Sequence, residues 1–213
     1  MSELKRTVLY QAHLDAGATM VDFGGWDMPI QYPEGIVAEH LYCRRHCGIF
    51  DVSHMGRINV EGPDMVAFLQ HVLSSNVLAL DLNQAQYCIL PDENGCAIDD
   101  AYLYRFETGK YFLVINAGNI DKDLAHLHKQ AEAFDVRLTN VSDRYAAIAV
   151  QGPESKKLLM TLAGGRQLTT ENVKNALGTL EMEGRPVRIA KTGYTGEPIG
   201  YELYCRSADA RYF

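Results

Sequence analysis

The sequence lacks an excess of basic residues. It has 20 Lys and Arg against 27 Asp and Glu, which gives a formal net charge of −7. Nucleic acids are bound through a basic face that neutralises phosphates, so this balance argues against nucleic acid as the main ligand. No apolar run approaches the roughly 20 residues that span a bilayer, so no membrane association is expected. The first residues contain neither the apolar core of a signal peptide nor an Arg- and Ser-rich transit peptide, which predicts a cytoplasmic protein.

Cysteines are few, and nucleotide-binding loops are missing. The 5 cysteines are Cys43, Cys47, Cys88, Cys96 and Cys205. Their odd number and irregular spacing do not form a disulfide framework and fit a reducing compartment. The chain has no Gly-x-x-x-x-Gly-Lys-Ser/Thr loop and no Gly-x-Gly-x-x-Gly after a strand, so the usual nucleotide and dinucleotide sites lack support.

The group most similar to a metal site is His40, Cys43, His46 and Cys47. If residues 36–47 form a helix, His40, Cys43 and Cys47 share one face. Positions i and i+7 are about 10.5 Å apart along a helix axis, however, whereas zinc holds its ligands at about 2.3 Å. Cysteines at such positions usually behave as small buried apolar residues. We therefore predict that the protein binds no metal.

Two similar segments lie about ninety residues apart, at 51–69 and 140–159. In each, apolar residues alternate with period two, a turn of Gly, Pro and an acid follows, and helical spacing comes next. Proline at the first helical position loses no needed N–H, and an acid beside it suits the positive end of the helix dipole. We interpret the segments as two related strand-turn-helix units. The alternative is a coincidence of short turns.

The rest of the chain predicts further strands and helices. Residues 87–90, 101–106 and 111–116 read as strands, the last two paired as a hairpin, and residues 121–134 read as a helix. Strands and helices mix without a regular βαβ rhythm. This pattern predicts an α+β fold with antiparallel sheets and packed helices.

The last residues resemble the start of a helix, with Ser207 as its N-cap and Asp209 in its first turn. A domain rarely ends inside the first turns of a helix, so we expect a chain truncated at its C-terminus. A short frayed tail is the alternative.

The first candidate site lies at the start of the strand at 101–106. Side chains alternate across a strand, so Asp100, Tyr102 and Tyr104 should project from one face and Asp99 from the other. A carboxylate beside two phenols suits a flat, nitrogen-rich ligand. The alternative is a solvated turn acid followed by an ordinary edge strand.

A second candidate site is the glycine-rich stretch 192–202. A carboxylate such as Glu202 can accept hydrogen bonds from a ring N–H and a neighbouring amine, as a pterin presents them, and Tyr194 can stack on the ring. A glycine-rich hairpin explains this stretch equally well.

Asn116, at the end of its strand, either donates to a ligand or caps a turn. Ser53 and His54 are adjacent on a strand and should face opposite ways, which argues against a Ser-His catalytic pair.

The order of several motifs resembles one family. These motifs are MVDFGGWDMP at 20–29, GIFDVSHMG at 48–56, NGCAIDD at 94–100, VQGP at 150–153 and TGYTGE at 192–197. Together they resemble the N-terminal portion of the aminomethyltransferases, the T-protein of the glycine cleavage system. The resemblance implies the folate-binding α+β fold of that family without its C-terminal β domain. It also implies a first-domain segment at 1–55 and a folate-binding region at 56–213 that contains both strand-turn-helix units.

The resemblance implies a reaction and its participants. Tetrahydrofolate would be the co-substrate and lipoylated H-protein the partner, with ammonia released and 5,10-methylenetetrahydrofolate formed. Asp100 matches the key catalytic carboxylate of the family. A chain that ends at Phe213 would leave the folate cavity open on one side, so weak binding and little transfer are expected. The implied folate contacts are Met55, Tyr87, Tyr102, Tyr104, Val114, Asn116, Tyr194 and Glu202.

Three features depart from the family pattern. Relatives carry aliphatic residues at the positions of Asn59 and Tyr102, and they have one residue fewer before the acid that matches Glu202. Other readings stay open: a folate-dependent transferase with another one-carbon donor, a non-catalytic folate-binding accessory protein, or a folded remnant. The accessory proteins carry a Lys-Gly-Cys-Tyr type signature, which the acid pair and the TGYTGE motif argue against.

Overall fold

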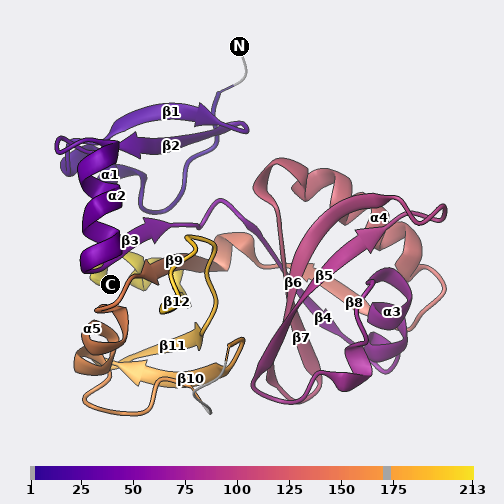
Figure 1. The fold of residues 1–213 in the computed structure, drawn as a ribbon. Helices are drawn as coiled ribbons and strands as arrows, with labels where there is room; N and C mark the ends of the chain where they lie inside the picture. The colour runs from indigo at the N-terminus through magenta and orange to yellow at the C-terminus, as the bar shows by residue number, and fades with distance from the viewer. Residues whose placement is uncertain (1–2, 170–173) are drawn as a thin grey trace. The chain divides into compact units, whose positions relative to one another are not determined.

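A computed structural model describes residues 3–169 and 174–213 (Figure 1). The chain forms two compact units that alternate along the sequence. We call them unit 1, with residues 3–54, 143–169 and 179–213, and unit 2, with residues 55–142 and 174–178. The predicted division between residues 55 and 56 lies next to the first passage between the units, but the chain returns to unit 1 after Ser142.

Unit 2 contains a five-stranded antiparallel sheet in the order β5-β6-β7-β4-β8. Its strands are β4 (Gly56–Glu61), β5 (Gln84–Pro91), β6 (Ala97–Glu107), β7 (Lys110–Ile115) and β8 (Arg137–Asn140). Its helices α3 (Met65–Val72) and α4 (Ile120–Ala131) contact each other and lie side by side in Figure 1. The three strands and the helix predicted between residues 87 and 134 are therefore confirmed as β5, β6, β7 and α4.

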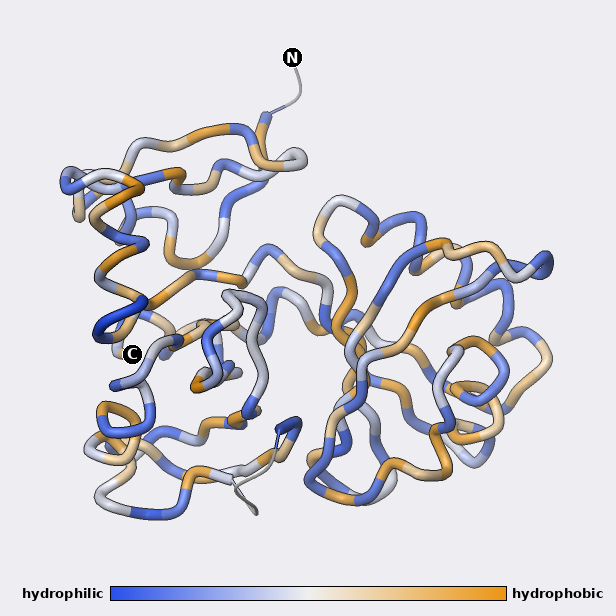
Figure 2. Tube along the Cα trace, in the orientation of Figure 1, coloured by the Kyte–Doolittle hydropathy of each residue, from blue (hydrophilic) through white to orange (hydrophobic). Residues whose placement is uncertain are grey.

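The core of unit 2 follows from the patterning of these elements. Leu103 and Leu113 face each other across β6 and β7, and both are fully buried. Phe68 and Leu69 of α3 and Leu127 of α4 are also fully buried. Figure 2 shows hydrophobic residues interspersed with hydrophilic ones along the chain, as expected for elements that bury only one side.

Unit 1 contains a second five-stranded sheet in the order β10-β11-β12-β9-β3. Its strands are β3 (Gly48–Asp51), β9 (Tyr145–Gln151), β10 (Leu177–Met182), β11 (Arg185–Ala190) and β12 (Gly200–Arg206). The hairpin and helices of the unit are β1 (Thr19–Phe23), β2 (Trp26–Gln31), α1 (Tyr10–Asp15), α2 (Ile36–Arg45) and α5 (Ser155–Leu162). Its core joins Leu159 of α5 to Ile148, Ile189 and Leu203 of the sheet. The α+β fold with antiparallel sheets is confirmed.

The two predicted strand-turn-helix units are confirmed as β4 to α3 in unit 2 and β9 to α5 in unit 1. Their turn glycines have similar backbone angles, with φ of +127° at Gly62 and +117° at Gly152. The position predicted for proline was wrong: the helices begin at Met65 and Ser155, two residues after the prolines. The N–H groups of these two residues bond to the glycine carbonyls, so each proline occupies the second position of a turn, where its fixed φ also fits.

The C-terminal residues Ser207–Tyr212 form a 3-10 helix, η4, so helical structure at the end of the chain is confirmed. Ser207 is not its N-cap as predicted, because the helix already includes it and Arg206 takes the capping position. The Ser207 hydroxyl instead donates to the carbonyl of Asp143 at 2.7 Å.

Gly152 gives a test of the repeated turn. A Cβ there would stand 2.5 Å from the Cys43 carbonyl oxygen, whereas a Cβ at Gly164, with φ of +61°, would meet nothing within 4 Å. We expect Gly152→Ala to destabilise the fold by at least about 3 kcal/mol, from backbone strain plus the collision. Gly164→Ala should cost about 1 kcal/mol, from the left-handed backbone alone. Urea unfolding measures both, and equal losses would contradict this account.

Candidate functional site

The predicted site residues fall in both units. Unit 2 holds Asp100 and most of the implied folate contacts, and unit 1 holds Tyr194 and Glu202. The contacts in unit 2 are Met55, Tyr87, Tyr102, Tyr104, Val114 and Asn116.

Asn116 and Asp100 meet at the edge where β7 ends and β6 begins. Ile115 pairs with Ala101, which brings Asn116, the next residue, opposite Asp100. The Asn116 amide nitrogen, Nδ2, donates to Asp100 Oδ1 at 2.6 Å and to Asp99 Oδ1 at 2.9 Å. One amide group therefore holds both adjacent carboxylates. Asn116 precedes η2 (Ala117–Asn119) but makes no side-chain capping bond, so neither predicted role describes this contact, and donation to a ligand stays a prediction.

Tyrosine rings line the strands beside Asp100. Tyr87 and Tyr102 are paired across β5 and β6, with ring centroids 5.8 Å apart, and Tyr104 follows at 5.6 Å from Tyr102. The Tyr87 phenol also interacts with the Asp100 carboxylate. This interaction raises the pKa of the Tyr87 phenol, because ionisation would place two negative groups together. Asp100 and the three tyrosines thus follow one face of β5 and β6.

Exposure differs sharply among these side chains. Tyr87 is 49% exposed, whereas Tyr104 is 0% exposed, with its ring stacked on Phe106. Tyr102 is buried and donates through its hydroxyl to Asn175 Oδ1 at 3.1 Å. Among the three tyrosines of this face, Tyr87 therefore has the accessible ring, while Tyr104 supports its neighbours from within the core.

Met55 and Val114 lie near a buried cation that the sequence analysis did not identify. Arg57 is fully buried, and its guanidinium donates to the Met55 carbonyl at 2.6 Å and to the Ser142 carbonyl. Arg57 pairs in register with the buried Val114. Arg57 thereby fixes the backbone at Met55, whose side chain is half-buried. Strand alternation places Arg57 on the face opposite to the apolar Ile58 and Val60, so no pattern in the sequence pointed to its burial.

Asp99 turns away from the tyrosines, as strand alternation predicts, and lies against α4. Its carboxylate interacts there with Asp123 of α4 and with Asn119, and its Oδ2 atom is buried without a donor. Burial acts to raise the pKa of Asp99, but the hydrogen bonds from Asp123, Asn116 and Asn119 outweigh it and lower the pKa. Asp123 was also missed, although its place four residues before the buried Leu127 marks it as inward-facing.

In unit 1 the glycine-rich stretch is organised around Gln151, a residue of the VQGP motif. The Gln151 amide donates to the carbonyls of Thr192 at 3.2 Å and Tyr201 at 3.1 Å. A Cβ at Gly193 or Gly200 would stand within 2.2 Å of the Gln151 amide oxygen, so neither position tolerates a side chain without rearrangement. The absence of side chains at these glycines therefore leaves room for the buried side chain of Gln151.

Tyr194 and Glu202 differ in exposure. Tyr194 is 63% exposed, and Glu202 is buried in β12. The Glu202 carboxylate accepts hydrogen bonds from the hydroxyls of Thr192 and Tyr204. Its role toward a pterin stays a prediction.

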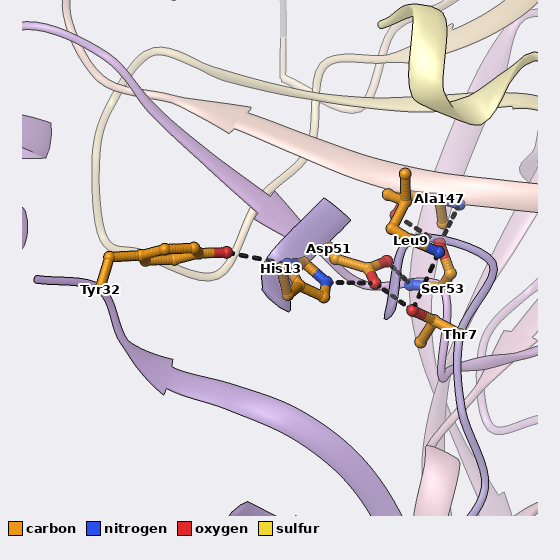
Figure 3. Close-up of polar contacts among 7 residues, drawn as sticks. All are labelled: Thr7, Leu9, His13, Tyr32, Asp51, Ser53 and Ala147. Atoms are coloured by element: carbon orange, nitrogen blue, oxygen red, sulfur yellow. Dashed lines mark hydrogen bonds and ion pairs between the residues drawn. The ribbon is translucent and has the colours of Figure 1, made fainter. Parts of the chain in front are cut away.

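A buried polar network ties the N-terminal segment to β3 (Figure 3). His13 contacts Asp51 Oδ2 through Nε2 at 3.0 Å and the Tyr32 hydroxyl through Nδ1 at 2.8 Å. Thr7 donates to the same Asp51 oxygen at 2.6 Å. Burial acts to raise the pKa of Asp51, but the hydrogen bonds from His13, Ser53 and Thr7 outweigh it and lower the pKa. This network holds α1, β3 and the end of β2 together.

Ser53 and His54 lie in the turn between β3 and β4 and not on a strand as predicted, but their side chains do contact different groups. The Ser53 hydroxyl exchanges hydrogen bonds with the backbone of Ala147, accepting at 3.0 Å and donating at 3.2 Å. The His54 ring lies edge-on to Phe23 at 5.7 Å.

Within residues 3–169 and 174–213, no three His, Cys, Asp or Glu side chains are grouped as a metal ion requires. Of the residues 36–47 considered as a helix, Ile36–Arg45 form α2 and Cys47 lies beyond its end. Burial raises the pKa of both Cys43 and Cys47. These thiols therefore stay protonated at neutral pH. Among the helices of the described residues, none is long and apolar enough to cross a membrane.

The arrangement defines an α+β protein with an acid-amide-tyrosine edge on one antiparallel sheet. Comparison with solved structures finds the same fold in the glycine cleavage system aminomethyltransferase T from Bartonella henselae, with a TM-score of 0.87 and 35% identity over 98% of this chain and 55% of that one. A heterotetrameric sarcosine oxidase from Corynebacterium shares the fold with a TM-score of 0.62 at 13% identity.

The family model described as the GCVT N-terminal domain matches residues 9–213, and the chain belongs to this family. Curated relatives include the aminomethyltransferases of Deinococcus deserti, 46% identical, and Thermus thermophilus, 47% identical, each matched over 97% of this chain. The chain spans 57% and 58% of the lengths of these relatives. The predicted resemblance to the N-terminal portion of the aminomethyltransferases is confirmed.

The bond between Tyr87 and Asp100 gives a test that needs no ligand. Asp100→Asn removes the carboxylate that raises the pKa of Tyr87, so we expect that pKa to fall toward its ordinary value. The ultraviolet absorbance of ionising tyrosine, compared with a Tyr87→Phe background, measures it. Asp121→Asn, on the exposed side of α4, serves as the control and should leave the titration unchanged. An identical Tyr87 titration in Asp100→Asn would contradict the hydrogen bond.

Proposed function

We propose that the chain takes part in tetrahydrofolate-dependent aminomethyl transfer from lipoylated H-protein in glycine cleavage. The observation that carries the proposal is the Asp100 carboxylate, held by Asn116 at 2.6 Å beside the exposed ring of Tyr87. Family membership and the names of the relatives support it, because they are aminomethyltransferases and one solved relative is the glycine cleavage system enzyme.

The residues of unit 2 fit a reduced pterin. A pterin presents neighbouring N–H and amine donors, and a carboxylate of fixed orientation accepts from such donors. Asp100 has that fixed orientation because Asn116 binds one of its oxygens. Tyr87 supplies a ring face or edge next to the carboxylate. The folate contacts predicted for Tyr194 and Glu202 of unit 1 stay predictions.

The proposed reaction moves one carbon between sulfur and folate. The bonds from this carbon to the lipoyl sulfur and to the amino nitrogen break, and bonds to two folate nitrogens form. The two folate N–H protons are balanced by the thiol and the ammonia that leave. Asp100 would stabilise the cationic iminium that forms as the carbon leaves sulfur, or accept the folate proton as a general base.

Replacement of Asp100 tests the function. Asp100→Asn keeps the shape of the side chain but removes its charge, so we expect tetrahydrofolate binding to stay measurable while turnover falls by at least about a hundredfold. Titration with tetrahydrofolate and ammonia release from aminomethylated H-protein measure the two effects, with Asp121→Asn as the matched control. Near-wild-type turnover in Asp100→Asn would refute the role of Asp100. A wild-type chain that does not bind tetrahydrofolate would refute the function itself.

A further inference from the structure

Asp123 is an acid buried behind the carboxylate edge of unit 2. It lies on α4 and is 0% exposed. In the described part of the chain, no N–H or O–H group of a non-acidic residue donates to either of its oxygens. The carboxyl group of Asp99, whose Oδ2 atom is likewise buried without a donor, is the acid that interacts with it. Two ionised carboxylates have only acceptors, so the two acids can bond to each other only if one of them carries a proton.

The other contacts of Asp99 decide which acid carries the proton. Asp99 already accepts from the Asn116 amide at 2.9 Å and from Asn119, and these bonds favour its ionised form. Asp123 has no comparable donor among the described residues. Burial, followed by the hydrogen bond to Asp99 and its charge, raises the pKa of Asp123 to about 8. At neutral pH, Asp123 is therefore the protonated donor and Asp99 the ionised acceptor.

The charged groups around Asp123 agree with this assignment. Asp99 and Asp100 of β6 both disfavour a further negative charge on it, and only Lys122, its neighbour on α4, favours one. The Lys122 ammonium group donates to the Ile98 carbonyl at 2.8 Å, which holds it to the backbone of β6. Asn116 and Asn119, the remaining polar groups at this point, are neutral.

These bonds form a continuous chain from α4 to the proposed site. Asp123 binds Asp99, Asp99 accepts from Asn116, and Asn116 donates to Asp100. We propose that Asp123 is a positioning residue, whose protonated carboxyl group donates to Asp99 and thereby fixes Asn116 and the Asp100 carboxylate for one-carbon transfer. The transfer step rests on the function proposed above, whereas the proton shared by the two acids does not.

Two substitutions separate the donor from the titrating proton. Asp123→Asn keeps a donor to Asp99 that does not ionise, and Asp123→Leu removes the donor with a side chain of similar size. In carbon NMR of the aspartate carboxyls, we expect one wild-type resonance to titrate near pH 8 and to be absent from Asp123→Asn. The Asn116 side-chain amide resonances should shift in Asp123→Leu and stay near their wild-type positions in Asp123→Asn.

Turnover and stability give the pH dependence. Ionisation of Asp123 places a second charge beside Asp99, so wild-type turnover should fall as the pH rises through about 8, and Asp123→Asn should not show this fall. At pH 7, Asp123→Leu should lower turnover by about tenfold or more, with tetrahydrofolate binding changed less.

A carboxyl group whose pKa is raised by folding stabilises the folded state at low pH, and this contribution is lost as the pH rises through the pKa of the folded state. The stability of Asp123→Asn should therefore fall less than that of wild type between about pH 5 and pH 9.

The outcomes distinguish this proposal from the proposed function. The carboxyl and amide resonances need no folate, so they decide the positioning role even if the wild-type chain binds no tetrahydrofolate. A titration near pH 8 that persists in Asp123→Asn overturns the proposal. Unmoved Asn116 resonances in a folded Asp123→Leu also overturn it. If Asp123→Leu does not fold, the Asp123→Asn titration and pH profile decide.

Discussion

The Asn116 amide is the contact on which the candidate site depends. Its two bonds, at 2.6 Å to Asp100 and 2.9 Å to Asp99, join two acids that would otherwise repel each other. Two ionised carboxylates next to each other in sequence need such a donor to keep fixed orientations. Because strand side chains alternate, Asp100 faces the tyrosines while Asp99 faces α4. The amide thus couples the tyrosine-bearing side of the sheet to the helix on its other side.

The strands themselves place this contact. The hairpin of β6 and β7 brings Asn116 opposite Asp100, and β5 adds Tyr87 on the same face. The fully buried Tyr104 and its stacked neighbour Phe106 give this face a rigid base. A carboxylate supported in this way needs little reorganisation free energy to take its orientation when a ligand binds, which is the property that electrostatic catalysis needs. The same unit therefore provides both the position and the chemistry of Asp100.

Short-range patterns predicted much of this arrangement. Period-two alternation located β6 and β7 and the shared face of Asp100 and Tyr102. The repeated Gly-Pro-acid turn predicted two similar strand-turn-helix units, which the structure places in different sheets. Long-range partners could not be predicted in this way. Asp123 meets Asp99 only because α4 packs behind β6, and the glycines near Tyr194 make room for the distant Gln151. Periodicity shows that a side chain faces inward but does not show which group it meets there. The prolines were misplaced by two residues because a turn and a first helical position both favour the φ that proline adopts.

A crystal structure of the chain with bound tetrahydrofolate tests the central claim most directly. The account predicts a carboxylate oxygen of Asp100 within about 2.6–3.2 Å of a pterin nitrogen, with Asn116 still bound to the same side chain and Tyr87 against the ring. A folate bound elsewhere, or an Asp100 side chain turned to solvent with its bond to Asn116 broken, would contradict it.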